Sequence, residues 1–236
     1  MTYMKLNKKY LKSLKEYKTL LVLYYLFLKE DKEGVIVFSI KNLISFWGFT
    51  PQRNNNKINM IFKNILDELK NNNIIISNID FNSISISDFV TVKFSSENNI
   101  PWYLNSKNYF VSLSIQELKT LKNYIDNSNE KIQIEKILYL YLLIKSYMNF
   151  SSQSLKYCFS SLDNLIKKSG LSRSSVLKYM SILQQANMIY IYNVGEYVDI
   201  DINIQKSPII YTLEKININL LKNNISSYLT NFNYWI

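Results

Sequence analysis

The stretch Ser161–Tyr192, SLDNLIKKSGLSRSSVLKYMSILQQANMIYIY, predicts two helices joined by a tight turn and followed by a strand. Ser161 is placed to cap the first helix, because a serine hydroxyl accepts hydrogen bonds from the unpaired amides of a helix start. Gly170 follows the last helical residue, where glycine adopts the required left-handed backbone at little cost. Ser172 is then placed to cap the second helix.

The second predicted helix has two different faces. Val176, Met180 and Leu183 recur at i, i+4 and i+7, which indicates a buried apolar stripe. The opposite face carries small, polar or basic side chains, namely Ser174, Lys178, Ser181 and Gln185. This is the character that a helix needs in order to lie in the major groove of DNA. Asn187 ends the helix, and Met188–Tyr192 is an apolar and aromatic run typical of a strand.

The segment 171–189, LSRSSVLKYMSILQQANMI, resembles the recognition helix of bacterial winged-helix proteins. In that family a turn of the Leu-Ser-Arg-Ser-Thr-Val type leads into the helix, and a short apolar exit leads into the wing. The resemblance implies a winged-helix unit that places one helix in the major groove. The alternative for the same residues is a helical hairpin that only packs in a core.

A second copy of the motif lies 122 residues earlier in the chain. Ser39–Thr50, SIKNLISFWGFT, aligns with Ser161–Ser172, SLDNLIKKSGLS, and five of the twelve positions are identical. The identities fall on the capping serine, on core positions and on the turn glycine, Gly48. Because these are the positions that physics constrains, internal duplication of one supersecondary unit is the simpler interpretation, although a biased composition produces such matches too.

After Thr50 the first copy diverges into a polar loop and a helix predicted over about 56–70. Its apolar stripe is Ile58, Phe62, Ile65 and Leu69. Two strands are predicted over 74–79 and 89–94, with 78–88, NIDFNSISISD, as a long wing between them. The polar loop would bring Arg53, Asn54, Asn55 and Lys57 to a duplex, where asparagine pairs with adenine and arginine with guanine. A plain solvated loop accounts for the asparagines equally well.

These patterns predict a mainly α fold with small β-wings (α+β). It consists of two tandem winged-helix domains, 1–98 and 111–213, joined by a polar linker, 99–110, and followed by a C-terminal helix, 214–236. The second wing, predicted over about 189–213, carries Glu196, Asp199 and Asp201, which would repel phosphate, and no contact with the DNA backbone is assigned to it.

Composition favours a polyanionic partner and excludes several kinds of catalytic site. The net charge is +10; residues 1–109 hold 15 basic and 9 acidic residues, and 110–236 hold 13 and 9, so both parts are positive. Lysines that serve only solubility are the alternative. Histidine is absent and Cys158 is the only cysteine, which removes imidazole bases and the usual metal clusters. None of the four glycines belongs to a phosphate-binding loop. We therefore expect no enzymatic activity, no cofactor and no metal, with a carboxylate-based metal nuclease as the remaining enzymatic alternative.

The chain has no apolar run long enough to span a bilayer, and its first residues do not resemble a secretory signal. A reduced, cytoplasmic setting is expected. Residues 3–30 are predicted to form one or two helices and residues 35–38 a short strand. The first part of the helical segment, Lys5–Lys18, is basic, and the run 20–28 is apolar nearly all round, which predicts a buried helix. Attachment of this basic part and the apolar run to a membrane surface is the alternative.

The resemblance implies sequence-specific binding of double-stranded, AT-rich DNA by a protein of plasmid, phage or mobile-element type. Replication initiation and transcription regulation remain open, as does a homodimer. A protein-interaction scaffold is the alternative function. The residues expected to contact DNA are Arg53, Asn54, Asn55, Lys57, Lys63, Lys167, Lys168, Ser172, Arg173, Ser174, Ser175, Lys178 and Tyr179.

Overall fold

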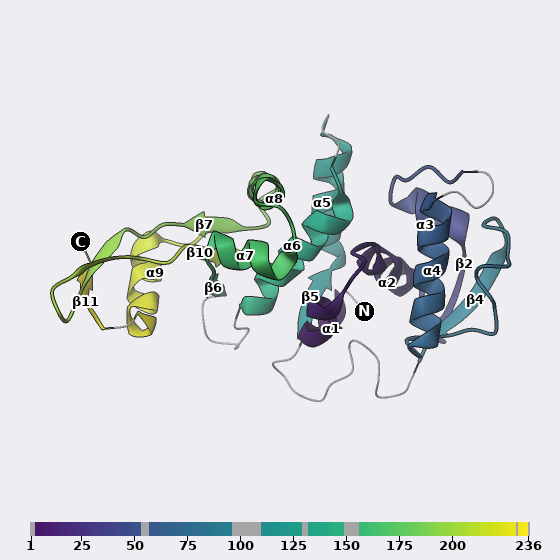
Figure 1. The fold of residues 1–236 in the computed structure, drawn as a ribbon, viewed down its shortest axis with the longest axis horizontal. Helices are drawn as coiled ribbons and strands as arrows, with labels where there is room; N and C mark the ends of the chain where they lie inside the picture. The colour runs from purple at the N-terminus through teal and green to yellow at the C-terminus, as the bar shows by residue number, and fades with distance from the viewer. Residues whose placement is uncertain are drawn as a thin grey trace. The chain divides into compact units, whose positions relative to one another are not determined.

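The computed structural model of the protein describes residues 3–52, 57–95, 110–128, 132–148, 156–229 and 231–235. Its fold is mixed α+β, with small antiparallel sheets (Figure 1). The chain separates into two units, Met1–Ser112 and Leu113–Ile236. Apart from its last residue, the predicted linker lies outside the described residues, and the boundary falls just beyond it.

Unit 1 begins with a strand where the sequence indicated only helix. In chain order its elements are β1 (Tyr3–Asn7), α1 (Lys8–Ser13), α2 (Lys18–Lys29), β2 (Val35–Ser39), α3 (Ile40–Phe46), α4 (Lys57–Asn71), β3 (Ile75–Ile76) and β4 (Phe89–Phe94). Strand β1 pairs with β5 (Phe110–Ser114), whose first three residues belong to this unit. The apolar helix α2 is buried along most of its length, as predicted, and it packs against α4.

The other sheet of unit 1 has the order β2-β4-β3, so the last strand in sequence lies in the centre. Strand β2 runs antiparallel to β4, from the pair Val35↔Lys93 to the pair Ser39↔Phe89. Inward residues such as Ile36 and Val92 are buried in the core. Residues paired across neighbouring strands lie on the same face of a sheet, and successive residues of one strand alternate between the two faces. Val35 and its partner Lys93 therefore lie on the opposite, outer face.

The segment 77–88 does not form the extended wing that the sequence predicted. Lys63 on α4 donates hydrogen bonds to the carbonyl oxygens of Asn82 (3.2 Å) and Ile84 (2.7 Å). Lys70, two turns further along the same helix, donates to the carbonyl oxygen of residue 79 at 2.8 Å. Between them Asp67 accepts a hydrogen bond from the amide of Phe81, whose ring is fully buried. The segment is therefore held against one side of α4.

Unit 2 contains the remaining elements. After β5 they are α5 (Ile115–Asp126), α6 (Ile134–Tyr147), β6 (Tyr157–Phe159), α7 (Leu162–Ser169), α8 (Arg173–Gln185), β7 (Tyr190–Tyr192), β8 (Glu196–Asp199), β9 (Ile204–Lys206), β10 (Ile210–Thr212), α9 (Ile218–Ile225), the 3-10 turn η1 (Ser226–Tyr228) and β11 (Phe232–Trp235). The predicted C-terminal helix is thus much shorter than 214–236. The chain then forms β11, which pairs with β8, so this segment belongs to unit 2.

Two three-stranded sheets lie in unit 2, with the orders β6-β10-β7 and β11-β8-β9. In the first sheet Tyr211 of β10 lies between Cys158 of β6 and Ile191 of β7. The second sheet is formed by β11 and the hairpin β8–β9, which is inserted between β7 and β10 within the predicted wing. Its strand β9 is exposed throughout.

A similar succession of elements occurs in both units, namely helix, strand, helix, helix, strand and a strand in the centre of the sheet, with the hairpin β8–β9 inserted before that central strand in unit 2. The local caps repeat as well. The hydroxyl of Ser39 accepts a hydrogen bond from the amide of Asn42 at 3.2 Å, and the hydroxyl of Ser161 accepts one from the amide of Asn164 at 3.1 Å. Gly48 and Gly170 have φ values of 77° and 67°. The repeated sequence motif therefore corresponds to a repeated local structure.

A buried ionic network joins α5 to α6. Lys145 Nζ lies 2.5 Å from Glu117 Oε1, and the hydroxyl of Tyr141 donates to the same oxygen. The second oxygen of Glu117 accepts the amide of Ser114 at 2.7 Å, which closes a capping box at the start of α5. Only 4% of the Lys145 side chain is exposed. One carboxylate thus pairs with a buried cation and also accepts a hydrogen bond from a backbone amide at the start of a helix.

Candidate nucleic-acid interface

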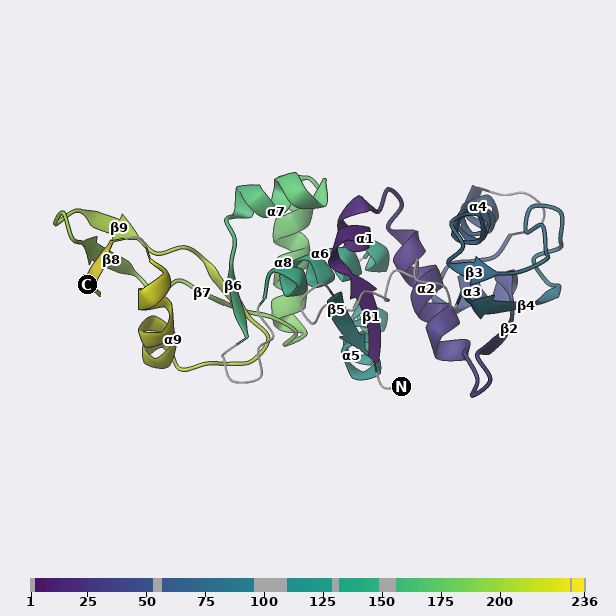
Figure 2. The ribbon, with the colours of Figure 1, turned by 90° about the horizontal axis from the view of Figure 1, so that it is seen from below.

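Helices α7 and α8 are joined by a tight turn, as the sequence predicted. Gly170 ends α7 with a left-handed backbone, and its amide donates to the carbonyl oxygen of Ile166 at 3.0 Å. The side chain of Leu171 is buried, and Ser172 caps the start of α8 by accepting a hydrogen bond from the amide of Ser175 at 3.2 Å. Figure 2 shows α7 lying across one end of α8, and both helices pack on α6. This arrangement holds α8 in one orientation on the surface of unit 2.

The first turn of α8 presents hydroxyl groups at its amino end. Ser172 Oγ lies 3.1 Å from Ser174 Oγ and donates to Ser175 Oγ at 2.9 Å. Hydroxyls and free amides at a helix start are favourable partners for phosphate oxygens, since the helix dipole is positive there. This end of α8 suits an anionic group.

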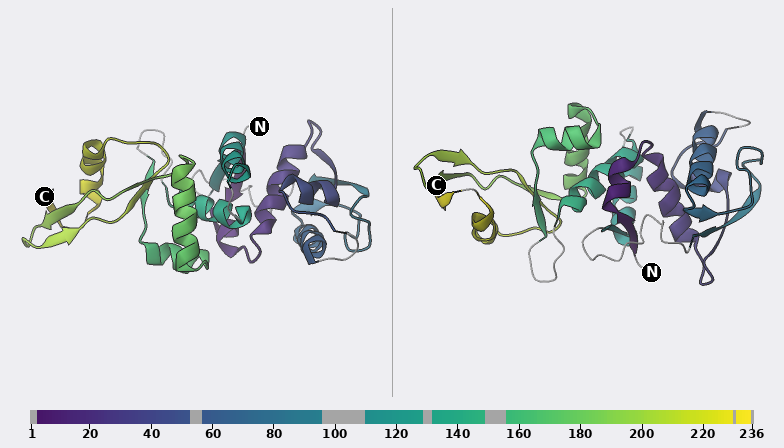
Figure 3. Two further views of the ribbon diagram at one scale, coloured as in Figure 1. Left: turned by 90° about the horizontal axis from the view of Figure 1, so that it is seen from above. Right: turned by 60° about the horizontal axis from the view of Figure 1, so that its bottom comes forward.

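The exposed face of α8 is continuous, polar and basic. At about 100° per residue its exposed positions fall within one arc of about 140°. These positions are Arg173, Ser174, Leu177, Lys178, Ser181, Gln184 and Gln185. The helix contains no aspartate or glutamate. Figure 3 (left) shows α8, in green, lying open on this side of unit 2.

Tyr179 is not on that face. Only 5% of the residue is exposed, and its hydroxyl donates to Gln133 Oε1 at 3.3 Å. Burial raises the pKa of this hydroxyl, so the tyrosine is neutral at pH 7. The expected contact of Tyr179 with DNA is therefore not supported by its position, because it lies on the core side of the helix with Val176 and Met180.

Basic residues flank the amino end of α8. Lys167 and Lys168 are exposed on the last turn of α7, which immediately precedes the turn. Arg173 Nη1 forms an ion pair with Asp163 Oδ1 at 3.1 Å, and the two side chains are 65% and 84% exposed. An ion pair this exposed contributes only about 0–1 kcal/mol, so a phosphate or a base edge can compete for the guanidinium group.

The corresponding helix of unit 1 is less suited to DNA. Lys57 is exposed at its start, but Lys63 is only 4% exposed and its ammonium group is bound to the carbonyl groups of segment 77–88. We therefore omit Lys63 from the interface. The exposed positions of α4 include Glu68, whose carboxylate would repel phosphate. The other predicted contacts of this unit, Arg53, Asn54 and Asn55, lie outside the described residues.

Asp199, one of the acidic residues of the predicted second wing, has a local role in the β8–β9 hairpin. Asp199 accepts hydrogen bonds from the amides of Asp201 (3.0 Å) and Asn203 (2.8 Å) and from the side chain of Gln205 (3.1 Å). These bonds lower the pKa of the Asp199 carboxyl, the amide of Asn203 being the main cause. The carboxylate thus organises the tip between β8 and β9.

Leu177 is a surface residue that the sequence interpretation missed. It is 48% exposed, on a helix whose other large apolar side chains are buried. The signal was present in the sequence, because Leu177 does not fall on the stripe Val176, Met180 and Leu183. It lies one turn from Ser174 and from Ser181, on the polar face.

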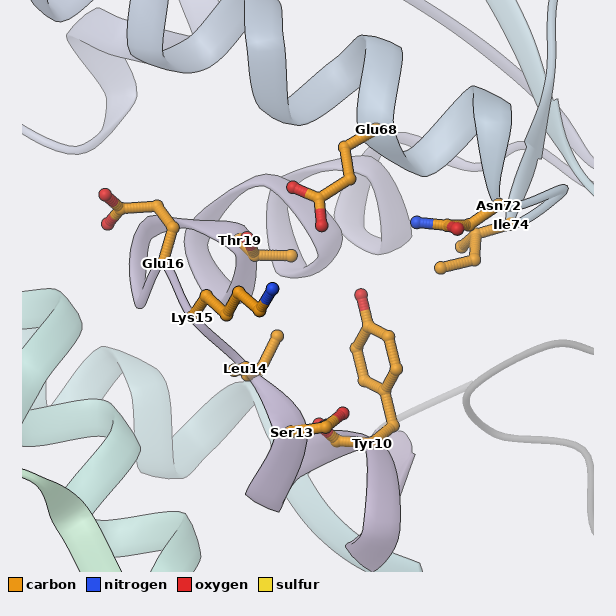
Figure 4. A pocket seen from close by; sticks show the side chains of 9 residues that line it. All are labelled: Tyr10, Ser13, Leu14, Lys15, Glu16, Thr19, Glu68, Asn72 and Ile74. Atoms are coloured by element: carbon orange, nitrogen blue, oxygen red, sulfur yellow. The ribbon is translucent and has the colours of Figure 1, made fainter.

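Unit 1 has a polar surface depression of about 330 Å³. The side chains of Tyr10, Lys15, Glu68 and Asn72 point into it from α1, the following loop, α4 and the turn after α4 (Figure 4). Burial, with a smaller contribution from Glu68, raises the pKa of the Tyr10 hydroxyl. This tyrosine is therefore a neutral hydrogen-bond donor at pH 7 and a poor nucleophile.

The described residues offer little other reactive chemistry. Within them no three cysteine, aspartate or glutamate side chains gather closely enough to hold a metal ion. Cys158 is buried, and burial raises its thiol pKa to about 12, which suppresses the reactive thiolate. No helix in the described parts of the chain combines the length and apolar character needed to cross a bilayer.

Comparison with known proteins adds no relative. No family model matches the chain, and no match was found among the curated proteins.

Proposed function

We propose that the protein binds double-stranded DNA in a sequence-specific manner and that α8 is the element that enters the major groove. The observation that carries this proposal is the exposed face of α8, which is continuous, contains Arg173 and Lys178, and has no carboxylate. Base edges in the major groove present donors and acceptors that arginine, lysine, glutamine and serine side chains recognise.

The architecture supports a winged-helix arrangement in each unit. A winged helix would give the observed succession of a helix, a strand, two helices and two strands. In both units the last of these strands lies between the other two. In unit 2 the sequence around Ser161–Tyr192 carries the resemblance to bacterial winged-helix proteins. Replication initiation or transcription regulation of a plasmid or another mobile element is the role that this resemblance favours.

The two units would make different contacts with DNA. Lys167, Lys168 and the hydroxyls at the start of α8 would contact phosphates, while side chains along α8 would contact bases. In unit 1 one side of α4 is covered by segment 77–88, and its exposed side carries Glu68. Unit 1 would therefore contribute phosphate contacts, from Lys57 and neighbouring basic residues, more than base recognition.

The first test is selection of bound sequences from a random duplex library by the full chain at two salt concentrations. We expect an enriched motif and a fall in affinity as salt rises. Three phosphate contacts would give a slope of about −3 for the logarithm of the association constant against that of salt. Salt-dependent binding without a motif would contradict specific recognition. Absence of binding would contradict the whole proposal.

Removing the carboxylate beside Arg173 should strengthen DNA binding. In the free protein Asp163 pairs with this arginine, and in a complex it would lie near the anionic duplex. We expect Asp163→Asn to raise affinity by up to about fivefold, which corresponds to the ~1 kcal/mol upper range of an exposed pair. Titration of the selected duplex by fluorescence anisotropy measures this change.

The matched control for this variant is the same substitution in an Arg173→Ala background. If Asp163 acts through the arginine, most of the gain should disappear there. An equal gain in both backgrounds would assign the effect to general charge repulsion.

A protein-interaction scaffold is the second candidate function, and the outer face of the unit 1 sheet favours it. Val37, Ile76 and Phe89, from three neighbouring strands, are each more than half exposed. Large apolar side chains that share one exposed face of a sheet are typical of a protein-contact surface. This function predicts that Phe89→Ser weakens partner binding and leaves DNA affinity unchanged.

A further inference from the structure

Leu177 occupies the middle of the exposed face of α8. With about 100° between successive residues, it lies inside the exposed arc, about 40° from each of Arg173 and Ser181. It is 48% exposed, whereas Val176 and Met180 on the same helix are buried. A single exposed leucine is common on protein surfaces, so its exposure alone indicates nothing. Its position among polar side chains is what requires an explanation.

The residues one turn away from Leu177 make it prominent. Ser174 and Ser181 have short side chains, so the isobutyl group of the leucine extends beyond them. Lys178 follows in the chain and is long enough to reach past the leucine to a phosphate or a base. A surface that approaches this helix would therefore meet an apolar group in the centre of a polar, basic face.

The base edges of the major groove expose one kind of methyl group. Adenine, guanine and cytosine present hydrogen-bonding atoms but no methyl group there, whereas thymine also presents its C5 methyl group. An apolar side chain held at the centre of a groove-binding face gains by covering that methyl group, and it loses by desolvating the polar edges of the other bases.

We propose that Leu177 contacts the C5 methyl group of a thymine and makes the DNA site selective for a T·A pair at the centre of the α8 contact. This inference rests on the proposed function, since it names the base feature that the same helix recognises. It predicts that the site bound by the protein contains at least one thymine whose methyl group matters.

Uracil substitution tests the contact directly. Each thymine of the selected duplex is replaced in turn by deoxyuridine, which keeps base pairing and removes only the methyl group. We expect one replacement to weaken binding of the wild-type protein by about fourfold, as burial of a methyl-sized group contributes ~0.8 kcal/mol. Leu177→Ala should bind the thymine and uracil duplexes equally, with an affinity near that of the wild type on uracil.

Leu220→Ala is the matched control. Leu220 is an equally exposed leucine (49%) on α9, and its substitution should leave the difference between thymine and uracil intact. Circular dichroism establishes that each variant is folded.

The outcomes separate this inference from the proposed function. Specific binding that depends on Arg173 but is unaffected by every uracil replacement would overturn the role of Leu177 alone. A uracil effect that persists in Leu177→Ala would assign the methyl group to another residue. Absence of specific binding by the wild-type protein would overturn both proposals.

Discussion

Replacing Glu117 by alanine is expected to lower the free energy of unfolding of unit 2 by about 3–5 kcal/mol. The reason is Lys145, whose ammonium group lies 2.5 Å from the carboxylate and whose side chain is almost fully buried. Alanine would leave this cation buried without a counter-charge. It would also remove the acceptors of the Tyr141 hydroxyl and of the Ser114 amide. Urea denaturation followed by circular dichroism measures the loss.

Lys122→Ala is the control on the same helix. Lys122 forms an i,i+4 ion pair with Asp126 at 2.9 Å, and that pair is exposed. An exposed helical pair of this kind contributes about 0.3–0.5 kcal/mol, so the control should change stability very little. Equal effects of the two substitutions would show that the buried network does not stabilise unit 2.

Acid titration supplies an independent measurement of the same network. Burial raises the pKa of Glu117, but Lys145 and the hydrogen bonds to the carboxylate outweigh it, so the pKa lies below its ordinary value of 4.5. The network therefore contributes its full stability above pH 4.5 and loses it as pH falls through the lowered pKa of the folded state. The free energy of unfolding of the wild type should therefore fall as the pH is lowered below 4.5. This part of the pH dependence should be absent from Glu117→Gln.

Local structure around the motif was predictable because short-range chemistry determines it. Ser161 and Ser172 accept amides three residues ahead of them, and Gly170 adopts the left-handed backbone that ends α7. These interactions span three or four residues, so a sequence window contains both partners. The same reasoning located α3 and the start of β2 in unit 1.

Contacts between residues distant in the sequence were not predictable in the same way. Lys63 looks like a surface cation on an amphipathic helix, yet its acceptors lie 19 and 21 residues further along, in a segment predicted to be a wing. No pattern in that segment shows that its carbonyl groups turn toward α4. The assignment of Tyr179 failed for a related reason, because an aromatic ring beside an apolar stripe is suited to either side of a helix.

Substitution of Arg173 or Lys178 by alanine should weaken specific DNA binding by about 1–3 kcal/mol each, or about 5- to 150-fold, if each contacts a base. Both residues lie on the exposed face of α8, and neither is part of the core. The variants should therefore keep the free energy of unfolding of the wild type to within about 0.5 kcal/mol. Anisotropy titrations of the selected duplex, with an unrelated duplex as competitor, measure the loss of specificity.

The comparison that decides the groove assignment is with Lys206→Ala. Lys206 is an exposed lysine on β9, so its removal subtracts one charge from unit 2 without changing α8. Loss of a distant charge acts through the screened field and should reduce binding to all duplexes slightly and equally. Base contacts behave differently, because their loss reduces binding to the selected site far more than to the unrelated one. If Arg173→Ala and Lys178→Ala affect both duplexes as weakly as Lys206→Ala does, α8 does not read the major groove.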